Sequence, residues 1–177
     1  MQDPRFSDSV LGGRFKILGR TLRPFSYWHL FQLEACESPF IEPDKLGDKR
    51  SVINALYVAF LICRTKYPKE AKPASKVSRW ITLSRIKDVE SEALKFAEYI
   101  QFHMQRPEFW IHESATLSKG QMPKSLAGVS GLMLMGMTER EAWNCSIGKG
   151  EWFKSARAVH QGDDLDFIEP ESEESIA

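Results

Sequence analysis

The sequence lacks the features that mark disulfide-bonded, secreted and membrane-spanning proteins. Only three of its 177 residues are cysteines, Cys36, Cys63 and Cys145, and they lie far apart among apolar neighbours. We expect them to be reduced residues of the core, because disulfide frameworks and zinc knuckles need paired cysteines. The longest apolar run, 52–63, is about half the length that spans a bilayer. The first residues lack the basic and apolar stretches of a secretory signal, so we expect a globular protein of the cytoplasm.

Residue patterns typical of metal sites are also missing. The four histidines are His29, His103, His112 and His160. None stands at the spacing of a zinc-binding motif, although His112 and the glutamate after it begin one. We interpret His29 as a hydrogen-bonded residue at the edge of the core. The sequence therefore predicts no metal and no cofactor.

The chain carries no recognisable nucleophile or phosphate-binding loop either. Nothing near Cys36 or Cys145 forms an arrangement known to lower the pKa of a thiol. The glycines at 12–13 and 148–150 lack the frames of loops that wrap phosphates. We interpret them as turn and helix-cap glycines. The sequence therefore predicts a protein that is not an enzyme.

A net charge of zero hides a strong asymmetry along the chain. Residues 163–177 contain seven acids and no base, so the rest of the chain carries a net charge of plus seven. Much of this excess lies in 64–87, where eight Lys or Arg residues accompany Glu70 alone. We expect a basic linker around 64–79 and a disordered acidic tail at 163–177. The two charged segments could also contact each other.

Helical periodicity dominates the rest of the sequence. Apolar spacing, capping residues and prolines predict helices over 27–36, 51–63, 88–105 and 126–135. We expect 27–36 and 51–63 to lie in the middle of the core, because both are apolar nearly all round. Alternation from Arg14 to Leu18, with glycines on both sides, indicates a short hairpin. Residues 79–87 fit a strand or a short helix equally well.

The chain is organised around a two-helix unit at 136–162. Thr138 is expected to cap the first helix in a capping box with Glu141, and Ala142 and Trp143 supply its apolar face. The second helix is expected from about Lys149 to Gly162. Its apolar stripe consists of Trp152, Phe153, Ala156 and Val159. This unit is suited to packing and carries no group equipped for chemistry.

These elements predict the fold class. The chain reads as a mainly α, irregular helical domain at 1–135, with the short N-terminal hairpin and the basic linker inside it. The two-helix unit at 136–162 follows, and the acidic tail at 163–177 ends the sequence.

The residue pattern of the C-terminal unit allows three interpretations. The methionines at 133, 135 and 137 give an adaptable apolar surface suited to holding another protein's helix. Alternatively, they and the aromatic stripe are core residues, the commoner outcome at helical spacing. A helix-turn-helix over 138–161, with phosphates bound by 64–87, is the nucleic-acid alternative. We rank it lower, because its second helix would aim an acid and two large aromatics at the DNA groove.

Two segments together resemble proteins encoded in the tail-gene clusters of tailed phages and prophages. Residues 18–41 resemble their opening L-x-P-F-S-x-x-H-L-x-x-L-E, and 137–153 resemble the closing T-E-x-E-A-W-x-M-P-L-G of tail assembly chaperone-like proteins. Cys145 and Ser146 stand where Met-Pro is usual. The two segments cover about a quarter of the chain.

The resemblance implies an assembly factor of the host cytoplasm that binds the tape measure or tail tube protein without catalysis. It also implies a face for this partner, or for self-association, formed by Trp143, Trp152, Phe153, Met133, Met135 and Met137. The first alternative is a minor virion structural protein of the head-tail or tail region. The second alternative is the helix-turn-helix nucleic-acid-binding protein.

Overall fold

The computed structural model describes residues 14–42, 49–72, 80, 82, 84, 88–105 and 122–162. This part of the chain is mainly helical with one short hairpin, as predicted. The acidic tail at 163–177 and most of 79–87 lie outside the described residues. In chain order the elements are β1 (Lys16–Ile17), β2 (Arg20–Thr21), α2 (Tyr27–Ala35), α3 (Lys49–Ile62), α5 (Val89–Met104), α6 (Lys124–Leu134), α7 (Glu139–Asn144) and α8 (Ile147–His160).

The predicted hairpin is present at the start of the described chain. Lys16 pairs with Thr21 and Ile17 with Arg20 in antiparallel register. The turn residues Leu18 and Gly19 have φ angles of 48° and 74°, and two positive φ angles suit the twist of a two-residue hairpin. The backbone N–H of Leu18 donates to Glu92 Oε2 over 2.7 Å, which fixes the hairpin to α5.

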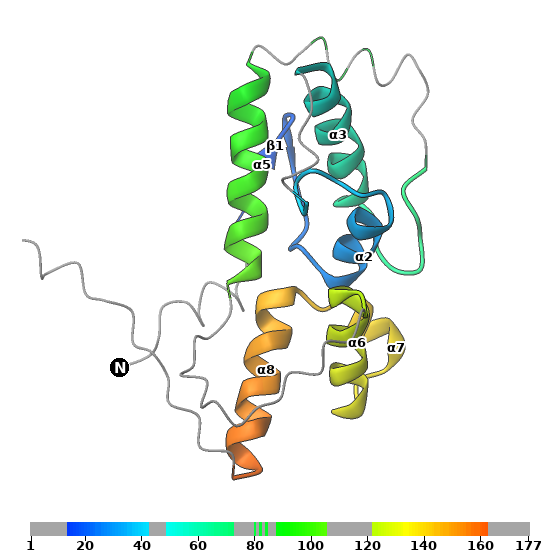
Figure 1. The fold of residues 1–177 in the computed structure, drawn as a ribbon, viewed down its shortest axis with the longest axis vertical. Helices are drawn as coiled ribbons and strands as arrows, with labels where there is room; N and C mark the ends of the chain where they lie inside the picture. Colours follow the sequence, from blue (N-terminus) through cyan, green and yellow to red (C-terminus); the bar gives the residue numbers. More distant parts are fainter. Residues whose placement is uncertain are drawn as a thin grey trace, which may run out of the picture.

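The helices form two groups with α2 between them (Figure 1). The hairpin, α3 and α5 make up one end of the molecule, which we call the α3–α5 half. The other end consists of α6, α7 and α8, which we call the α6–α8 half. Helix α2 packs against α3 on one side and against α6 and α7 on the other, and α5 also contacts α8. Helix α2 therefore holds the two groups together.

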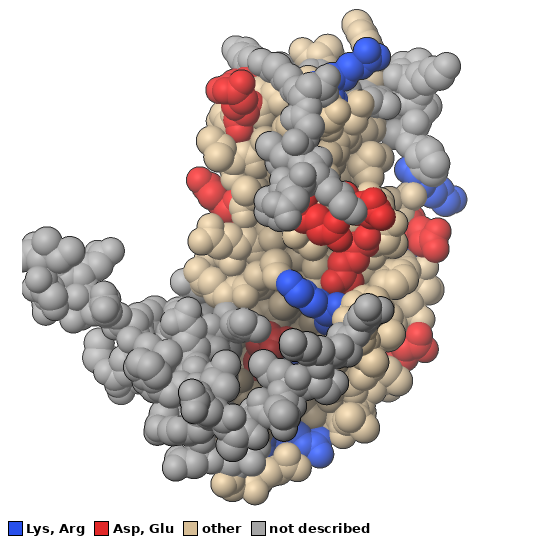
Figure 2. All heavy atoms as spheres, in the orientation of Figure 1, with Lys and Arg blue, Asp and Glu red and all other residues tan. Residues whose placement is uncertain are grey.

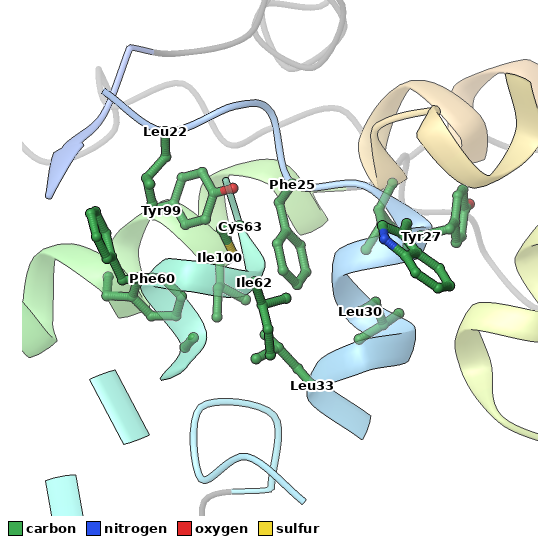
Figure 3. Packing of buried hydrophobic residues seen from close by; sticks show 14 of the residues in the cluster. Leu22, Phe25, Tyr27, Leu30, Leu33, Phe60, Ile62, Cys63, Tyr99 and Ile100 are labelled. Carbon is green, nitrogen blue, oxygen red and sulfur yellow. The ribbon is translucent and has the colours of Figure 1, made fainter. Parts of the chain in front are cut away.

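Large apolar side chains fill the α3–α5 half. Phe96 and Tyr99 of α5 have no solvent exposure, and their rings lie 5.6 Å apart. The rings of Phe25, which precedes α2, and Tyr99 lie 5.8 Å apart, and Figure 3 shows Ile62 close to Phe25. Helix α3 is less completely buried than expected, because Val58 is exposed. The buried residues of α5 are Phe96, Tyr99, Ile100 and His103.

The expectation of three buried cysteines holds in part. Cys63 of α3 is fully buried beside Tyr99, and Cys145 is half-buried. Cys36, the C-cap residue of α2, is exposed. All three are free thiols.

Candidate binding pocket between the starts of α2 and α8

The capping box predicted for the first helix of the C-terminal unit is present. The hydroxyl of Thr138 accepts from the backbone N–H of Glu141 at 3.3 Å, and the Glu141 carboxylate accepts from the backbone N–H of Thr138 at 3.0 Å. Burial of Ala142 and Trp143 on this short helix, α7, also follows the prediction. These two hydrogen bonds therefore fix the start of α7 at Glu139.

Backbone hydrogen bonds join the link between α7 and α8 to the segment before α2. Tyr27 N–H donates to the carbonyl oxygen of Cys145 over 3.2 Å, and Ile147 N–H donates to that of Phe25 over 3.1 Å. The N-cap residues of the two helices, Ser26 and Ser146, consequently lie side by side. Helix α8 begins at Ile147, two residues before the predicted Lys149. Ser146 is a favoured N-cap residue, and this signal could have placed the start correctly.

The Tyr27 side chain fills the contact between α2 and the α6–α8 half, and we call this contact with Gly128 and Gly150 the seam. A Cβ atom at Gly128 of α6 would lie 2.1 Å from the Tyr27 ring, and one at Gly150 of α8 would lie 2.8 Å from it. The Tyr27 hydroxyl donates to Glu151 Oε1 over 2.7 Å. Interpretation of the glycines at 148–150 as turn and cap residues was wrong. They lie in the first turn of α8, where Gly150 gives the Tyr27 ring room.

This close approach also changes which face of α8 is buried. Its buried residues are Ile147, Gly148, Gly150 and Ser155. The predicted apolar stripe is not the buried face, because Ala156 and Val159 are exposed while Trp152 and Phe153 are half-buried. Small residues occupy the contact because only they fit against the tyrosine ring.

An open pocket of about 790 Å³ lies beside this seam. It extends from the segment before α2 to the α6–α7 turn and the first turns of α8. The residues lining it include Arg23, Ser26, His29, Thr65, Lys66, Met135, Gly136, Met137, Glu141, Asn144, Cys145, Ser146, Lys149 and Phe153. Its lining therefore combines apolar residues, among them Met135, Met137 and Phe153, with charged and polar ones.

The sharp turn that presents the two methionines follows the end of α6. Gly136 has a φ angle of 92°, and its N–H donates to the carbonyl oxygen of Met133 over 2.9 Å. Met137 N–H donates to the carbonyl oxygen of Leu132 over 3.2 Å. These bonds form a Schellman motif, in which glycine takes the left-handed position. Met135 and Met137 are thereby held on either side of Gly136, at the pocket.

His29 shapes the pocket without being available as a base. Its Nδ1 accepts from the Ser26 N–H at 3.2 Å, and its Nε2 donates to the carbonyl oxygen of Thr65 at 3.1 Å. Burial lowers the pKa of His29 to about 4, and the charge of Arg23 acts in the same direction. His29 is hydrogen-bonded, as predicted, and its deep burial keeps it neutral.

The thiol at the pocket is poorly suited to nucleophilic attack. Burial raises the pKa of Cys145, and the charge of Lys149 offsets this only in part. A thiol with a raised pKa is mostly protonated at neutral pH, and only the thiolate reacts. With both nitrogens of His29 engaged, Cys145 and His29 do not form a nucleophile and base pair.

The pocket brings together three of the six predicted partner-binding residues, Met135, Met137 and Phe153. Met133 lies on α6 and is exposed, and Trp152 is half-buried on α8. Trp143 lies apart from these residues and is 9% exposed. A binding role for the six residues stays a prediction.

Trp143 belongs to an aromatic cluster that fastens α7 to α2. Its ring lies 5.7 Å from that of Trp28, 5.4 Å from that of Phe31 and 5.8 Å from that of Tyr67. Trp28 Nε1 donates to the carbonyl oxygen of Lys69 over 3.1 Å. Such packing stabilises the fold, with about 0.5–1.5 kcal/mol per ring pair beyond the area buried. Spacing along α7 could not distinguish this internal position from a surface one.

The arrangement of α7 and α8 differs from that of a DNA-binding helix-turn-helix. The first residues of a recognition helix contact base edges, whereas Ile147, Gly148 and Gly150 at the start of α8 are buried. On the face drawn in Figure 2, basic side chains of the described residues form small groups with acidic ones between them. This face carries no continuous basic stripe of described residues.

The described residues form neither a metal site nor a membrane-spanning helix. They contain no group of three or more His, Cys, Asp or Glu residues arranged to hold a metal ion. Within the same residues, every helix is too short or too polar to cross a membrane. Comparisons of the chain with known protein families, curated proteins and solved structures gave no match.

Proposed function

We propose that this protein is a phage tail assembly factor that binds an apolar helical segment of another structural protein, the tape measure or the tail tube. The observation that carries the proposal is the pocket wall formed by Met135, Met137 and Phe153. Methionine side chains adapt to different apolar partners. A helix laid into such a groove presents apolar side chains three or four residues apart.

The exposed surface of α6 extends this wall. Leu126, Met133 and Leu134 are exposed, and their spacing of seven and eight residues places them on one side of the helix. Leu134, which immediately precedes Met135, is 81% exposed. A partner helix that covers both the wall and this side of α6 would remove several large apolar groups from water. Burial of each stabilises a complex by roughly 1.5–3 kcal/mol before the costs of association.

The proposal is tested by co-purification with the long helical protein of the same tail-gene cluster. Leu134→Asp should weaken binding at least about tenfold, because a carboxylate would enter an apolar interface. Leu94→Asp is the matched control, since Leu94 is 65% exposed on α5 in the other half of the molecule. Equal capture by the two variants, or no capture by the unaltered chain, would contradict this role. Presence of the protein in purified particles would instead support a minor virion component.

A further inference from the structure

The pocket carries three cationic groups whose charges are not neutralised by acids of the described chain. Arg23, Lys66 and Lys149 line it, and no carboxylate among the described residues forms an ion pair with any of them. Glu141 is the only acid among the described lining residues, and its bonds go to Thr138. The starts of α2 and α8 add the positive ends of two helix dipoles. The pocket is therefore suited to an anionic ligand.

The cationic and apolar sides of the pocket adjoin each other. Lys149 Nζ lies 5.3 Å from the centre of the Phe153 ring, and Met135 and Met137 complete the apolar side. An inorganic anion would satisfy the charge and leave the apolar wall uncovered. A peptide with carboxylates next to an apolar side chain would satisfy both.

The chain itself contains such a peptide. Residues 163–177 hold seven acids and no base, and Asp166 and Glu169 flank Phe167 and Ile168. We propose that this C-terminal segment binds in the pocket, with its carboxylates near the cationic groups and Phe167 against the apolar wall. A partner that uses the same wall must then displace the segment.

The lengths agree with this placement. Helix α8 rises about 1.5 Å per residue, so Phe153 lies about 14 Å and Lys149 about 20 Å from Gly162 along its axis. An extended chain gains about 3.3–3.6 Å per residue. Phe167 can therefore lie about 17 Å from Gly162, and Glu169 about 24 Å. A segment that returns along α8 brings Phe167 to Phe153 and Glu169 to Lys149.

The test measures how fast N-ethylmaleimide alkylates Cys145 in the full chain, in a Cys36→Ser background that removes the exposed thiol. A bound segment shields Cys145, so neutralising it with Asp166→Asn and Glu169→Gln should raise the rate about threefold, given the usual strength of exposed ion pairs. Glu173→Gln with Glu174→Gln is the matched control, because it removes the same charge away from Phe167. It should change the rate less.

Two further variants examine the other partners in the contact. Phe167→Ala should raise the alkylation rate as the neutralised pair does. Lys66→Gln should also raise the alkylation rate. Combined with Asp166→Asn and Glu169→Gln it should raise the rate little further, because both changes remove the same interaction. An unchanged rate in the neutralised pair, or an equal rise in its control, would overturn the proposal. The assay contains no second protein, so its outcome is independent of the assembly role.

Discussion

The two halves of the molecule exclude water in different ways. In the α3–α5 half, large side chains such as Phe96 and Tyr99 fill the interior with their volume. In the α6–α8 half, Gly128 and Gly150 let two helices close around the ring of Tyr27. A core filled by large side chains loses stability when side-chain atoms are removed. A helix contact that depends on glycines loses stability when side-chain atoms are added.

The difference also accounts for the position of the pocket. Small residues bring the backbones of α2, α6 and α8 together at Tyr27, but they cannot fill the space beside that contact. The pocket lies in this space, next to the joined N-caps Ser26 and Ser146. In the α3–α5 half bulky side chains pack together, and Figure 3 shows Phe25 with Tyr99 and Ile62 near it.

The largest expected loss of stability comes from removing volume in the α3–α5 half. Phe96→Ala deletes a fully buried ring that contacts Phe40 and Tyr99. It should lower the free energy of unfolding by about 3–5 kcal/mol, measured by urea denaturation. Phe96→Leu keeps most of the volume and should cost less than about 1.5 kcal/mol. Similar losses of stability for the two variants would mean that the volume of the side chain at position 96 does not stabilise this half.

A smaller loss is expected from adding one methyl group at the seam. Gly128→Ala places a Cβ atom 2.1 Å from the Tyr27 ring and should lower the free energy of unfolding by about 1–3 kcal/mol. Gly131→Ala, one turn further along α6, meets only the flexible side chain of Lys154 at 3.2 Å. It should leave stability unchanged or raise it by up to about 1 kcal/mol, because alanine favours helix. The prediction fails if both alanines behave alike in urea denaturation.

At pH 7 the smallest effect on stability is expected at two buried histidines, whose substitution also changes how stability responds to pH. Burial lowers the pKa of both His29 and His103 from 6.5 to about 4 in the folded chain. Between these values the unfolded chain binds more protons, so stability is complete above about pH 6.5 and falls as the pH drops towards 4. Each histidine contributes at most about 1.4 kcal/mol per pH unit. His103→Phe should flatten this dependence, measured as thermal unfolding between pH 7 and 4.5.

Comparison with His29→Phe distinguishes titration from packing. Neither ring nitrogen of His103 has a hydrogen-bond partner among the described residues, and rings of Phe15, Tyr99 and Phe102 surround it. His103→Phe should therefore retain or raise stability at pH 7. His29→Phe should flatten the pH dependence as well but lower stability at pH 7, because Ser26 and Thr65 lose their partner. An unchanged pH dependence in both variants would contradict this explanation.

Much of the secondary structure was predictable because its signals are local. Asp88 caps α5 by accepting from the N–H groups of Glu90 and Ser91, and Thr138 with Glu141 caps α7. Gly19 and Gly162 take the positive φ angles expected where a hairpin turns and a helix ends. Each of these features depends on residues within four positions of one another. The residues around each cap and turn were therefore sufficient to predict it.

The candidate pocket was less predictable because its parts are distant in the sequence. Met135, Met137 and Phe153 were singled out from periodicity, but no spacing linked them to Arg23 or Lys66. Trp143, to which the resemblance assigns a partner-binding role, packs among Trp28, Phe31 and Tyr67. A helix pattern gives the side on which a residue lies, and only the neighbouring helices decide whether that side is covered.

The sequence by itself determined a mainly helical chain with a short hairpin, its capped helices and the hydrogen-bonded role of His29. Only the tertiary structure decided that Gly128 and Gly150 close on Tyr27, and that the starts of α2 and α8 meet beside a pocket. The physical reason lies in the range of the forces. Capping and periodic burial act within a turn or two of helix, whereas the fit of a tyrosine ring between two glycines joins residues more than a hundred positions apart.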